Sequence, residues 1–540
     1  MNKVKKIALI LLIWLLTIFF ISVAQSHPIS ISQNTASLFQ IPVIFWIVML
    51  ASPFLLYLIA KDSKNPLVSL VCVILYYFLF FSFGLYFMSH PATSDIQSSA
   101  GFQAVLSTIT HIGPQEINIE PYFMWPIFFI FSKIFTSILG IGPIQTINLG
   151  FFSLLLILPV LLSLFYKGTN KVENATIYLI FPALYLTLGY HFINAQFVPQ
   201  FLALIYLFIL FGFYLKYRRG KNPLFILLMV IFYALTVSTH AFMFIFFLVA
   251  MIFEIYWSEY IEMKRNKVIS YGLIIIFFAI LYPYIGIYYS FVTYTTGGES
   301  WRIFERFFSE RTPIEVGYQM QKLYHLVPGI YDQLLTSIGK FVLVAVFFIA
   351  TIGFLFYIFK KRKLFDLSLI VGSASWFALG LSGLVLGQRA VQVAALPLAR
   401  HFKYPHKLFS YLSKVVVIII LIAPSLFITN HMMNSSIGGD GLVQDPEENI
   451  AGRFMDRHIT NESFVLFAQN AYPTGYPSGF EKIKLINIIR YKHKYGWEKL
   501  DFVLESPKLQ KQLDYLNIKR PKDHSDSFVY NNEDIKLVFK

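Results

Sequence analysis

The carboxylate of Asp95 is the side chain in this sequence best suited to acid–base chemistry. It lies in residues 89–121, a polar stretch that follows the apolar run 67–88, and a spanning helix needs about 20 such residues. Just beyond a membrane surface a charged carboxylate remains in water, so its charge costs little free energy. There it can take a proton from a hydroxyl within hydrogen-bond reach. Alternatively, Ser94 and Asp95 cap a short surface helix by accepting from free backbone N–H groups.

A histidine and a strip of amides are the next candidates. His240 lies between two hydrophobic runs in TVSTHAFMF, where an ionisable group near the membrane interior is a functional candidate. It either binds a phosphate or polarises a substrate, or it caps an external turn. His191, Asn194, Gln196 and Gln200 form a polar strip in YHFINAQFVPQ. They either line a sugar pocket or satisfy one another and the backbone in a hydrogen-bonded loop.

Arg389 is the sharpest cationic candidate. It lies at the end of a hydrophobic run in LVLGQRAVQVAALPLAR, where a guanidinium can grip a phosphate through paired donors. The alternative is an interfacial arginine that reaches to lipid headgroups. Arg302 belongs to GGESWRIFERFFSERTP, whose alternating aromatics and arginines are typical of an interfacial amphipathic helix. Arg302 and Glu120 are further candidates for contact with a substrate.

The composition predicts a polytopic membrane protein. Of its 540 residues 56% are hydrophobic and 14% are charged, with a mean hydropathy of +0.62, whereas about a quarter of the residues of a soluble domain are charged. The net charge of +15 comes from short basic clusters between hydrophobic runs. Such clusters mark cytoplasmic loops and do not form a nucleic-acid surface. Cys72 is the sole cysteine, which excludes a disulfide within the chain.

The apolar runs predict about 12–13 transmembrane helices, the first of which we interpret as a retained helix with its basic end in the cytoplasm, although a secretory signal is an alternative. The runs cover residues 7–24, 41–60, 67–88, 147–166, 176–190, 201–215, 224–238, 241–257, 269–290, 341–359, 367–387, 390–402 and 415–429.

The segment 122–138 decides the topology. If it crosses the membrane fully, the later basic clusters, including 216–221, become external, against the positive-inside rule. If it is instead a re-entrant or interfacial piece interrupted by Pro126 and Lys133, these clusters fall in the cytoplasm. We therefore expect the second arrangement, in which the loops 89–121 and 295–339 and the polar tail are extracytoplasmic. Residues 191–200, 238–240 and 388–389 fall on the same side, so the polar features converge there.

The chain divides into three parts on this reasoning. Residues 1–66 carry two N-terminal helices, 67–432 form the main membrane domain, and 433–540 form a small α/β extracytoplasmic domain. Asn434 and Asn461 lie in sequons that are open to glycosylation on that side;. No phosphate-binding glycine loop, GxSxG or HExxH motif occurs;. No Asp-x-Asp pair lies near Asp95, so we predict no cofactor, and a bound metal has little support.

Several segments together resemble the C-type glycosyltransferase superfamily, membrane enzymes that use polyprenyl-phosphate sugars. The loop HPATSDIQSSAGFQ with its early aspartate is followed by EPYFMWPIFFIFSKIFTSILGIG, and FVPQFLALIYLFILFGFYLKYRR comes later. A Thr239-His240 pair and Arg389 near a following proline agree with this resemblance. Near His191 and Asn194, however, the second carboxylate usual in the family is missing, so an inactive homologue, or one with a different acceptor, is an alternative.

The resemblance implies an integral plasma-membrane enzyme that acts on its extracytoplasmic face. Asp95 would be the general base, while Arg389 and His240 would stabilise the leaving polyprenyl phosphate. The acceptor would be a lipid, a glycan or a protein, and the anomeric carbon would be inverted. Two other classes fit many of the same residues: a flippase or transporter of lipid-linked saccharides, and a surface-polysaccharide polymerase. We see no internal repeat of the kind that transporters show.

Overall fold

The structure is a computed structural model of the whole chain. It describes residues 3–25, 43–60, 65–81, 125–141, 157–162, 185, 199–220, 222–240, 243–260, 271–283, 351, 355, 364–381, 390–401, 463–467, 483–487, 502–505, 528–532 and 535–539.

The membrane part is built from helices, as the composition predicted. Most are apolar around their whole circumference, which is the pattern of helices that lie in lipid or in a packed interior. The labelled helices are α1 (Lys3–Gln25), α2 (Val43–Ala60), α3 (Pro66–Phe81), α7 (Ile127–Leu139), α10 (Pro199–Gly220), α11 (Leu224–Thr239), α12 (Met243–Tyr260), α17 (Leu364–Leu381) and α18 (Ala390–His401). An unlabelled helix covers Tyr271–Pro283.

One stretch in the described part of the chain, Pro199–Arg218 of α10, is both long and apolar enough to cross a membrane by itself. Shorter apolar stretches, of 10 to 17 residues, lie in α2, α7, α11, α12, α17 and the helix Tyr271–Pro283. Several of these coincide with predicted spans, including α11 with 224–238 and α12 with 241–257. The mainly α-helical fold of a polytopic membrane protein is confirmed, whereas the total of 12–13 crossings stays a prediction.

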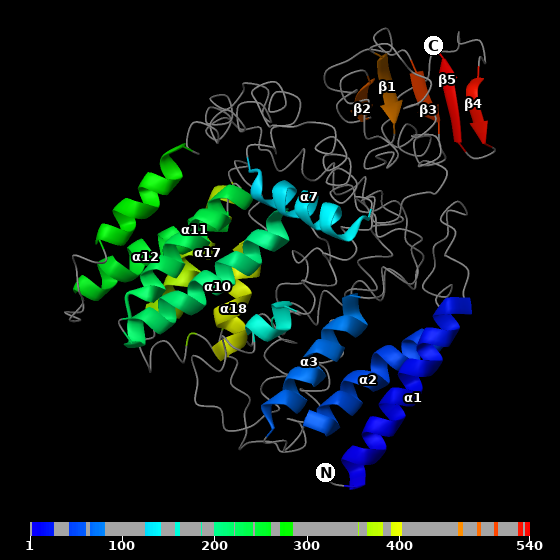
Figure 1. The fold of residues 1–540 in the computed structure, drawn as a ribbon, viewed down its shortest axis with the longest axis horizontal. Helices are drawn as coiled ribbons and strands as arrows, with labels where there is room; N and C mark the ends of the chain where they lie inside the picture. Colours follow the sequence, from blue (N-terminus) through cyan, green and yellow to red (C-terminus); the bar gives the residue numbers. More distant parts are fainter. Residues whose placement is uncertain are drawn as a thin grey trace.

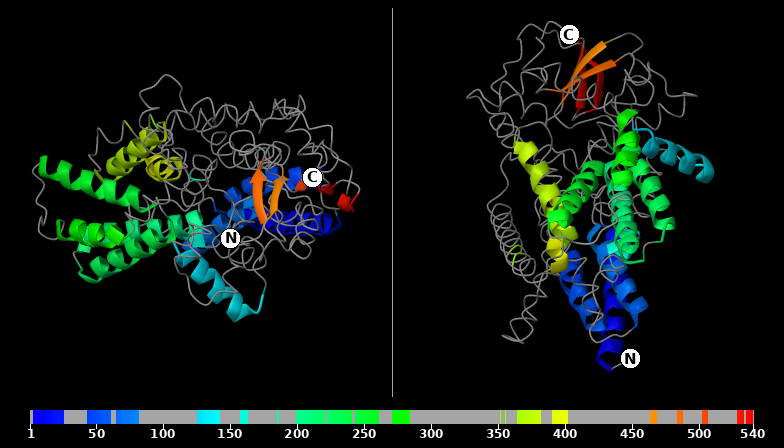
Figure 2. Two further views of the ribbon diagram at one scale, coloured as in Figure 1. Left: turned by 90° about the horizontal axis from the view of Figure 1, so that it is seen from above. Right: turned by 90° about the vertical axis from the view of Figure 1, so that its left-hand side faces the viewer.

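The described helices form two groups. Helices α1, α2 and α3 pack on one another in chain order. In the second group α10 packs along α11, α12 along α17, and α17 against α18, and the contacts of α12 with α10 and α11 are less extensive. Figures 1 and 2 show the first group beside the second, with the C-terminal sheet and the N-terminus of α1 on opposite sides of the helices.

Helices α3 and α11 begin with the same side-chain hydrogen bond. The sequence KNPL occurs at residues 64–67 and again at 221–224. In both copies the Asn side chain accepts from the backbone N–H two residues ahead: Asn65 from Leu67 at 3.0 Å and Asn222 from Leu224 at 2.9 Å. The proline supplies a fixed φ and needs no partner for an N–H group at a helix start. In both copies the Asn-Pro pair therefore begins an apolar helix in the same way.

Helix α7 is the described part of the segment 122–138. Its 13 residues span about 20 Å at 1.5 Å each, which is less than the hydrocarbon core of a bilayer. Phe128, Phe129 and Ser132 are buried on one face, and Lys133 is exposed. Figure 1 places α7 on the side of the helices nearer the C-terminal sheet. This length supports the re-entrant or interfacial interpretation, which stays a prediction.

Gly140 ends α7 in a left-handed conformation, with φ 64° and ψ 28°. Its N–H donates to the carbonyl of Thr136 at 2.9 Å. Glycine is the residue that adopts this conformation without steric cost, and it is the usual stop signal at a helix C-terminus. The GIGP sequence therefore fixes where α7 ends.

The C-terminal region contains a five-stranded mixed sheet in the order β2-β1-β3-β5-β4. Strand β1 pairs in parallel with β2 and with β3, and β5 pairs antiparallel with β3 and β4. The strands are β1 (Ser463–Phe467), β2 (Ile483–Asn487), β3 (Phe502–Glu505), β4 (Phe528–Asn532) and β5 (Ile535–Phe539). Any helices of the predicted α/β domain lie outside the described residues, so that prediction and the proposed boundary at 432–433 stay untested.

Candidate functional site

His240 is the predicted site residue whose surroundings the structure describes in most detail. It caps α11 in an extended conformation, with φ −154° and ψ 136°, and its N–H donates to the Thr236 carbonyl at 3.2 Å. The residue is only 5% exposed. The neighbouring Thr239 is also buried, and its Oγ1 donates to the Leu235 carbonyl at 2.6 Å. The His240 side chain is therefore buried at the end of α11.

Gln200 lies at the same end of the α10–α11 hairpin as His240. It is the second residue of α10, and α11 runs antiparallel to α10, as the ring contacts Tyr206–Phe232 and Phe213–Phe225 show. Residues near the start of α10 and near the end of α11 are therefore neighbours along the hairpin axis. The sequence predicted that these polar groups converge on one side of the membrane. The structure brings these two to one end, and their function stays a prediction.

The other predicted site residues lie outside the described residues. They are Asp95, Glu120, His191, Asn194, Arg302 and Arg389.

A buried face of α11 leads inward from His240. Residues three and seven positions apart share a helix face, so Tyr233, Thr236 and His240 lie in a row. Tyr233 and Thr236 are fully buried. Thr236 donates to the Phe232 carbonyl at 2.7 Å, whereas the Tyr233 hydroxyl has no hydrogen-bond partner. This face is therefore buried, but it also carries the hydroxyls of Tyr233 and Thr236 and the imidazole of His240.

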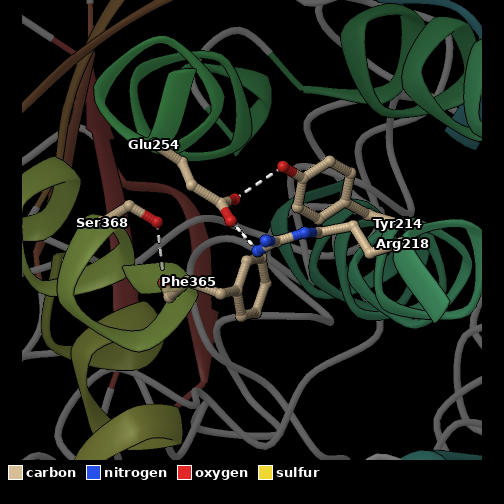
Figure 3. Close-up of polar contacts among 5 residues, drawn as sticks. All are labelled: Tyr214, Arg218, Glu254, Phe365 and Ser368. Carbon is tan, nitrogen blue, oxygen red and sulfur yellow. Dashed lines mark hydrogen bonds and ion pairs between the residues drawn. The ribbon is translucent and has the colours of Figure 1, made fainter. Parts of the chain in front are cut away.

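A second polar cluster, which was not predicted from the sequence, lies toward the opposite end of α10 and α12. Glu254 of α12 is 0% exposed, and both of its carboxylate oxygens accept hydrogen bonds from α10 (Figure 3). The Tyr214 hydroxyl donates to Oε2 at 2.5 Å. Arg218 donates through Nη1 to Oε1 and forms an ion pair with it. These three residues are called the Glu254 cluster below.

Helix α17 closes the other side of the Glu254 cluster. The Phe365 ring lies 5.6 Å from the Tyr214 ring and 5.7 Å from the Phe211 ring, centroid to centroid. Asp366 and Ser368, in the same part of α17, are fully buried. The Ser368 hydroxyl donates to the Phe365 carbonyl at 2.7 Å (Figure 3). Three helices therefore meet around one carboxylate.

The two polar regions are well separated. From Gln200 to Arg218 α10 rises by about 27 Å at 1.5 Å per residue, which approaches the thickness of the hydrocarbon core. The cluster end carries Lys216, Arg218 and Arg219 of α10, and the His240 end carries no Lys or Arg in its described residues. No three His, Cys, Asp or Glu side chains gather into a metal-binding group among the residues that the structure describes.

Glu254 carries a signal in the sequence by which it could have been found. It is an acidic residue in MFIFFLVAMIFEIYWSEY, the apolar sequence of α12, and ionisable residues within such segments usually pair inside a protein. Its partner was harder to find, because Arg218 belongs to a basic cluster that resembles an ordinary cytoplasmic loop.

The fold of this chain is like that of a solved membrane oligosaccharyltransferase, which agrees with the fold that the sequence resemblance implied. No protein-family model matches the sequence, and no curated protein does either. Among solved structures, the apo oligosaccharyltransferase of Archaeoglobus fulgidus superposes with a TM-score of 0.52 at 12% identity, over 82% of this chain and 70% of that one.

Further solved structures match over similar shares of this chain. The same enzyme tethered to an acceptor peptide with an NVT sequon gives a TM-score of 0.50 at 10% identity, over 82% of this chain and 69% of that one. ArnT from Cupriavidus metallidurans bound to undecaprenyl phosphate gives 0.49 at 10% identity, over 87% of this chain and 97% of that one. At such identities the likeness concerns the fold.

Proposed function

We propose that this protein is a membrane glycosyltransferase that moves a sugar from a polyprenyl-phosphate donor to an acceptor hydroxyl on the extracytoplasmic face. The observation that carries the proposal is the placement of buried His240 and of Gln200 at one end of an α10–α11 hairpin, in a chain that has the fold of a membrane oligosaccharyltransferase. A site at a helix end near the membrane surface can receive a lipid-linked donor from the bilayer and an acceptor from water.

The proposed chemistry is an in-line displacement at the anomeric carbon. Asp95 takes the proton of the acceptor hydroxyl as the acceptor oxygen attacks that carbon. The bond between the anomeric carbon and the phosphate oxygen breaks on the opposite side, and polyprenyl phosphate leaves with the bonding electrons. The anomeric configuration is therefore inverted. Neither a metal nor an organic cofactor is needed to balance this step.

Charge grows on the phosphate oxygen as the bond breaks. Arg389 is proposed to bind that phosphate by paired donors, and His240 is proposed to donate a hydrogen bond to it, because donors fixed in a water-poor site stabilise developing charge effectively. His240 suits this role because it is almost fully buried and its backbone is held by Thr236. His191, Asn194, Gln200, Glu120 and Arg302 are proposed to contact the sugar or the acceptor.

The orientation in the membrane is part of the proposal. The basic residues at the Glu254 end of α10 favour the cytoplasm for that end. We therefore propose that the His240 end, the loop with Asp95 and the C-terminal sheet are extracytoplasmic. The A. fulgidus enzyme of the same fold has been solved with a tethered acceptor peptide. A protein acceptor is therefore proposed beside a lipid or glycan acceptor.

The test is transfer from a panel of radiolabelled polyprenyl-phosphate sugars by the purified protein in lipid nanodiscs. Asp95→Asn is the active-site variant, and Glu505→Gln in strand β3 is a matched control that removes one carboxylate elsewhere. We expect release or transfer of sugar by the wild type and by Glu505→Gln, and its loss in Asp95→Asn. Full turnover by Asp95→Asn would refute the role of the base. Binding of donor without turnover would instead favour a flippase or an inactive homologue.

A further inference from the structure

We infer that the ion pair between Arg218 and Glu254 is a clamp between two pairs of membrane helices, and that it positions His240 at their other end. The inference rests on the proposed function only where transfer kinetics are measured. The measurements of distance and of unfolding temperature test it independently of that function.

The described helices α10, α11, α12 and α17 pack as two pairs. Helices α10 and α11 are joined along their length by ring contacts, among them Tyr206–Phe232 at 5.9 Å and Phe213–Phe225 at 6.1 Å. Helices α12 and α17 form the second close pair. The backbone of α12 approaches Gly372 of α17, where an added Cβ would lie 3.4 Å from the Phe246 carbonyl oxygen. The interface between the two pairs is less extensive than either of these.

The chain links the two pairs at one end. His240 is the last described residue of the α10–α11 pair, and α12 begins at Met243. The hydrogen bonds of Glu254 link the pairs toward the other end, because Tyr214 and Arg218 belong to α10 and Glu254 belongs to α12. From Met243 to Glu254 α12 rises by about 17 Å. A covalent connection and an ion pair thus hold the same interface near its two ends.

The burial of Glu254 makes its ion pair with Arg218 sensitive to the relative position of α10 and α12. A carboxylate that is 0% exposed is stable only where both oxygens have donors, and loss of one partner leaves a buried charge uncompensated. Arg218 is 35% exposed in its side chain, so its stem reaches from the surface to the interior. Any separation of the two pairs at this end would open the ion pair to water or strand it in the apolar interior. The arrangement in which the two helix pairs stay together at this end is therefore favoured over arrangements in which they separate.

The position of His240 depends on this arrangement through its helix. Its backbone is bonded to α11, and its side chain is buried, so its position relative to α12 depends on the angle between the two helix pairs. The clamp, some three turns away, restrains that angle together with the ring contacts of Phe247 with Phe211 and Tyr233. Arg218 and Glu254 are therefore positioning residues in this proposal, and they do not touch the reacting groups.

The experiment measures the distance between the helix pairs directly. In a Cys72→Ala background, spin labels are placed at Lys216→Cys on α10 and Tyr256→Cys on α12, two exposed positions beside the cluster, and their distance distribution is recorded in lipid nanodiscs by pulsed electron resonance. Into this background go Glu254→Gln, Arg218→Gln, the double variant Glu254→Gln/Arg218→Gln, and the control Glu505→Gln. Unfolding temperature and transfer kinetics are measured on the unlabelled proteins.

We expect each single variant at the clamp to broaden and lengthen the distance distribution and to lower the unfolding temperature by several degrees. The double variant removes the stranded charge, so it should regain the unfolding temperature while its distance distribution stays broad. Its kcat should fall at least tenfold at an unchanged KM for the donor. Glu505→Gln should match the wild type in all three measurements.

Two results would overturn the inference. One is a single variant at the clamp whose distances equal those of the control, because the pair would then hold nothing in place. The other is a double variant that regains distances and kcat along with stability, because the pair would then act only on stability. If no donor supports transfer by the wild type, the proposed function fails, and the distance measurement still decides the inference.

Discussion

The ring of Tyr233 in α11 packs against the ring of Phe277 at a centroid distance of 4.3 Å, while its hydroxyl has no hydrogen-bond partner. An unpaired buried hydroxyl costs about 1–3 kcal/mol. We expect Tyr233→Phe to leave the free energy of unfolding unchanged or to raise it by up to about 1 kcal/mol, because it deletes that cost and keeps the ring contact. Thermal unfolding of the purified protein in detergent measures the effect.

Tyr214 supplies the matched control for this prediction. It is also buried, but its hydroxyl donates to Glu254. Tyr214→Phe should lower the free energy of unfolding by about 1–3 kcal/mol, since a carboxylate oxygen loses its donor. Equal effects of the two substitutions would show that the Tyr233 hydroxyl is satisfied in the membrane, for example by a buried water.

Two helical glycines should respond in opposite ways to a larger side chain. An added Cβ at Gly212 of α10 meets nothing within 4 Å, whereas at Gly372 of α17 it contacts α12. Gly212→Ala should stabilise the protein by about 0.5–1 kcal/mol, as the helix interior loses a glycine. Gly372→Leu should destabilise it by about 1–3 kcal/mol, because the helices must move apart. A Gly372→Leu variant as stable as Gly212→Ala would show that α17 does not pack on α12 in this way.

Replacement of His240 should affect turnover more than folding. If it donates to the departing phosphate, His240→Ala should lower kcat by about a hundredfold, a typical loss for one such donor. His240→Asn retains an N–H donor and should recover part of the rate. Transfer kinetics with the donor found active in the panel measure both. An unchanged kcat in His240→Ala would leave His240 as a cap of α11.

The two faces of α7 predict different surroundings for adjacent residues. Ile134 is among the exposed apolar side chains of this helix, and Lys133 is exposed beside it. If α7 lies in the interface, a spin label at Ile134→Cys should collide more often with lipid-soluble oxygen than a label at Lys133→Cys. The second label should collide more with a water-soluble nickel chelate. Equal profiles at the two positions would contradict an interfacial helix.

The helices that the structure describes were largely predictable, because apolar runs of membrane length carry a strong signal. The predicted run 224–238 differs from α11, Leu224–Thr239, by a single residue, and the run 41–60 ends with α2 at Ala60. The start of α17 was placed three residues late, because Asp366 was counted with the loop, whereas it is buried in the first turn. A carboxylate there faces the free N–H groups of a helix start, which hydropathy alone does not recognise.

The site was only partly predictable. His240 and Gln200 were selected because polar residues at the ends of apolar runs stand out, and the hairpin brings them to one end. The Glu254 cluster was missed because pairing across helices depends on their rotation, which the sequence does not state. Nothing in the basic run at 216–221 distinguishes Arg218, which turns inward to Glu254, from Lys216, which lies over the Phe225 ring at 5.8 Å.

The strand order of the C-terminal sheet has a consequence for biosynthesis. Strand β5, residues 535–539, lies inside the sheet between β3 and β4, so neither of those strands has its full set of backbone partners until β5 has been made. Chains are synthesised from the N-terminus at about 5–20 residues per second. By then the segments of α10, α11, α12, α17 and α18 have already been translated. The sheet is therefore completed late, after the helices that precede it have had time to enter the bilayer.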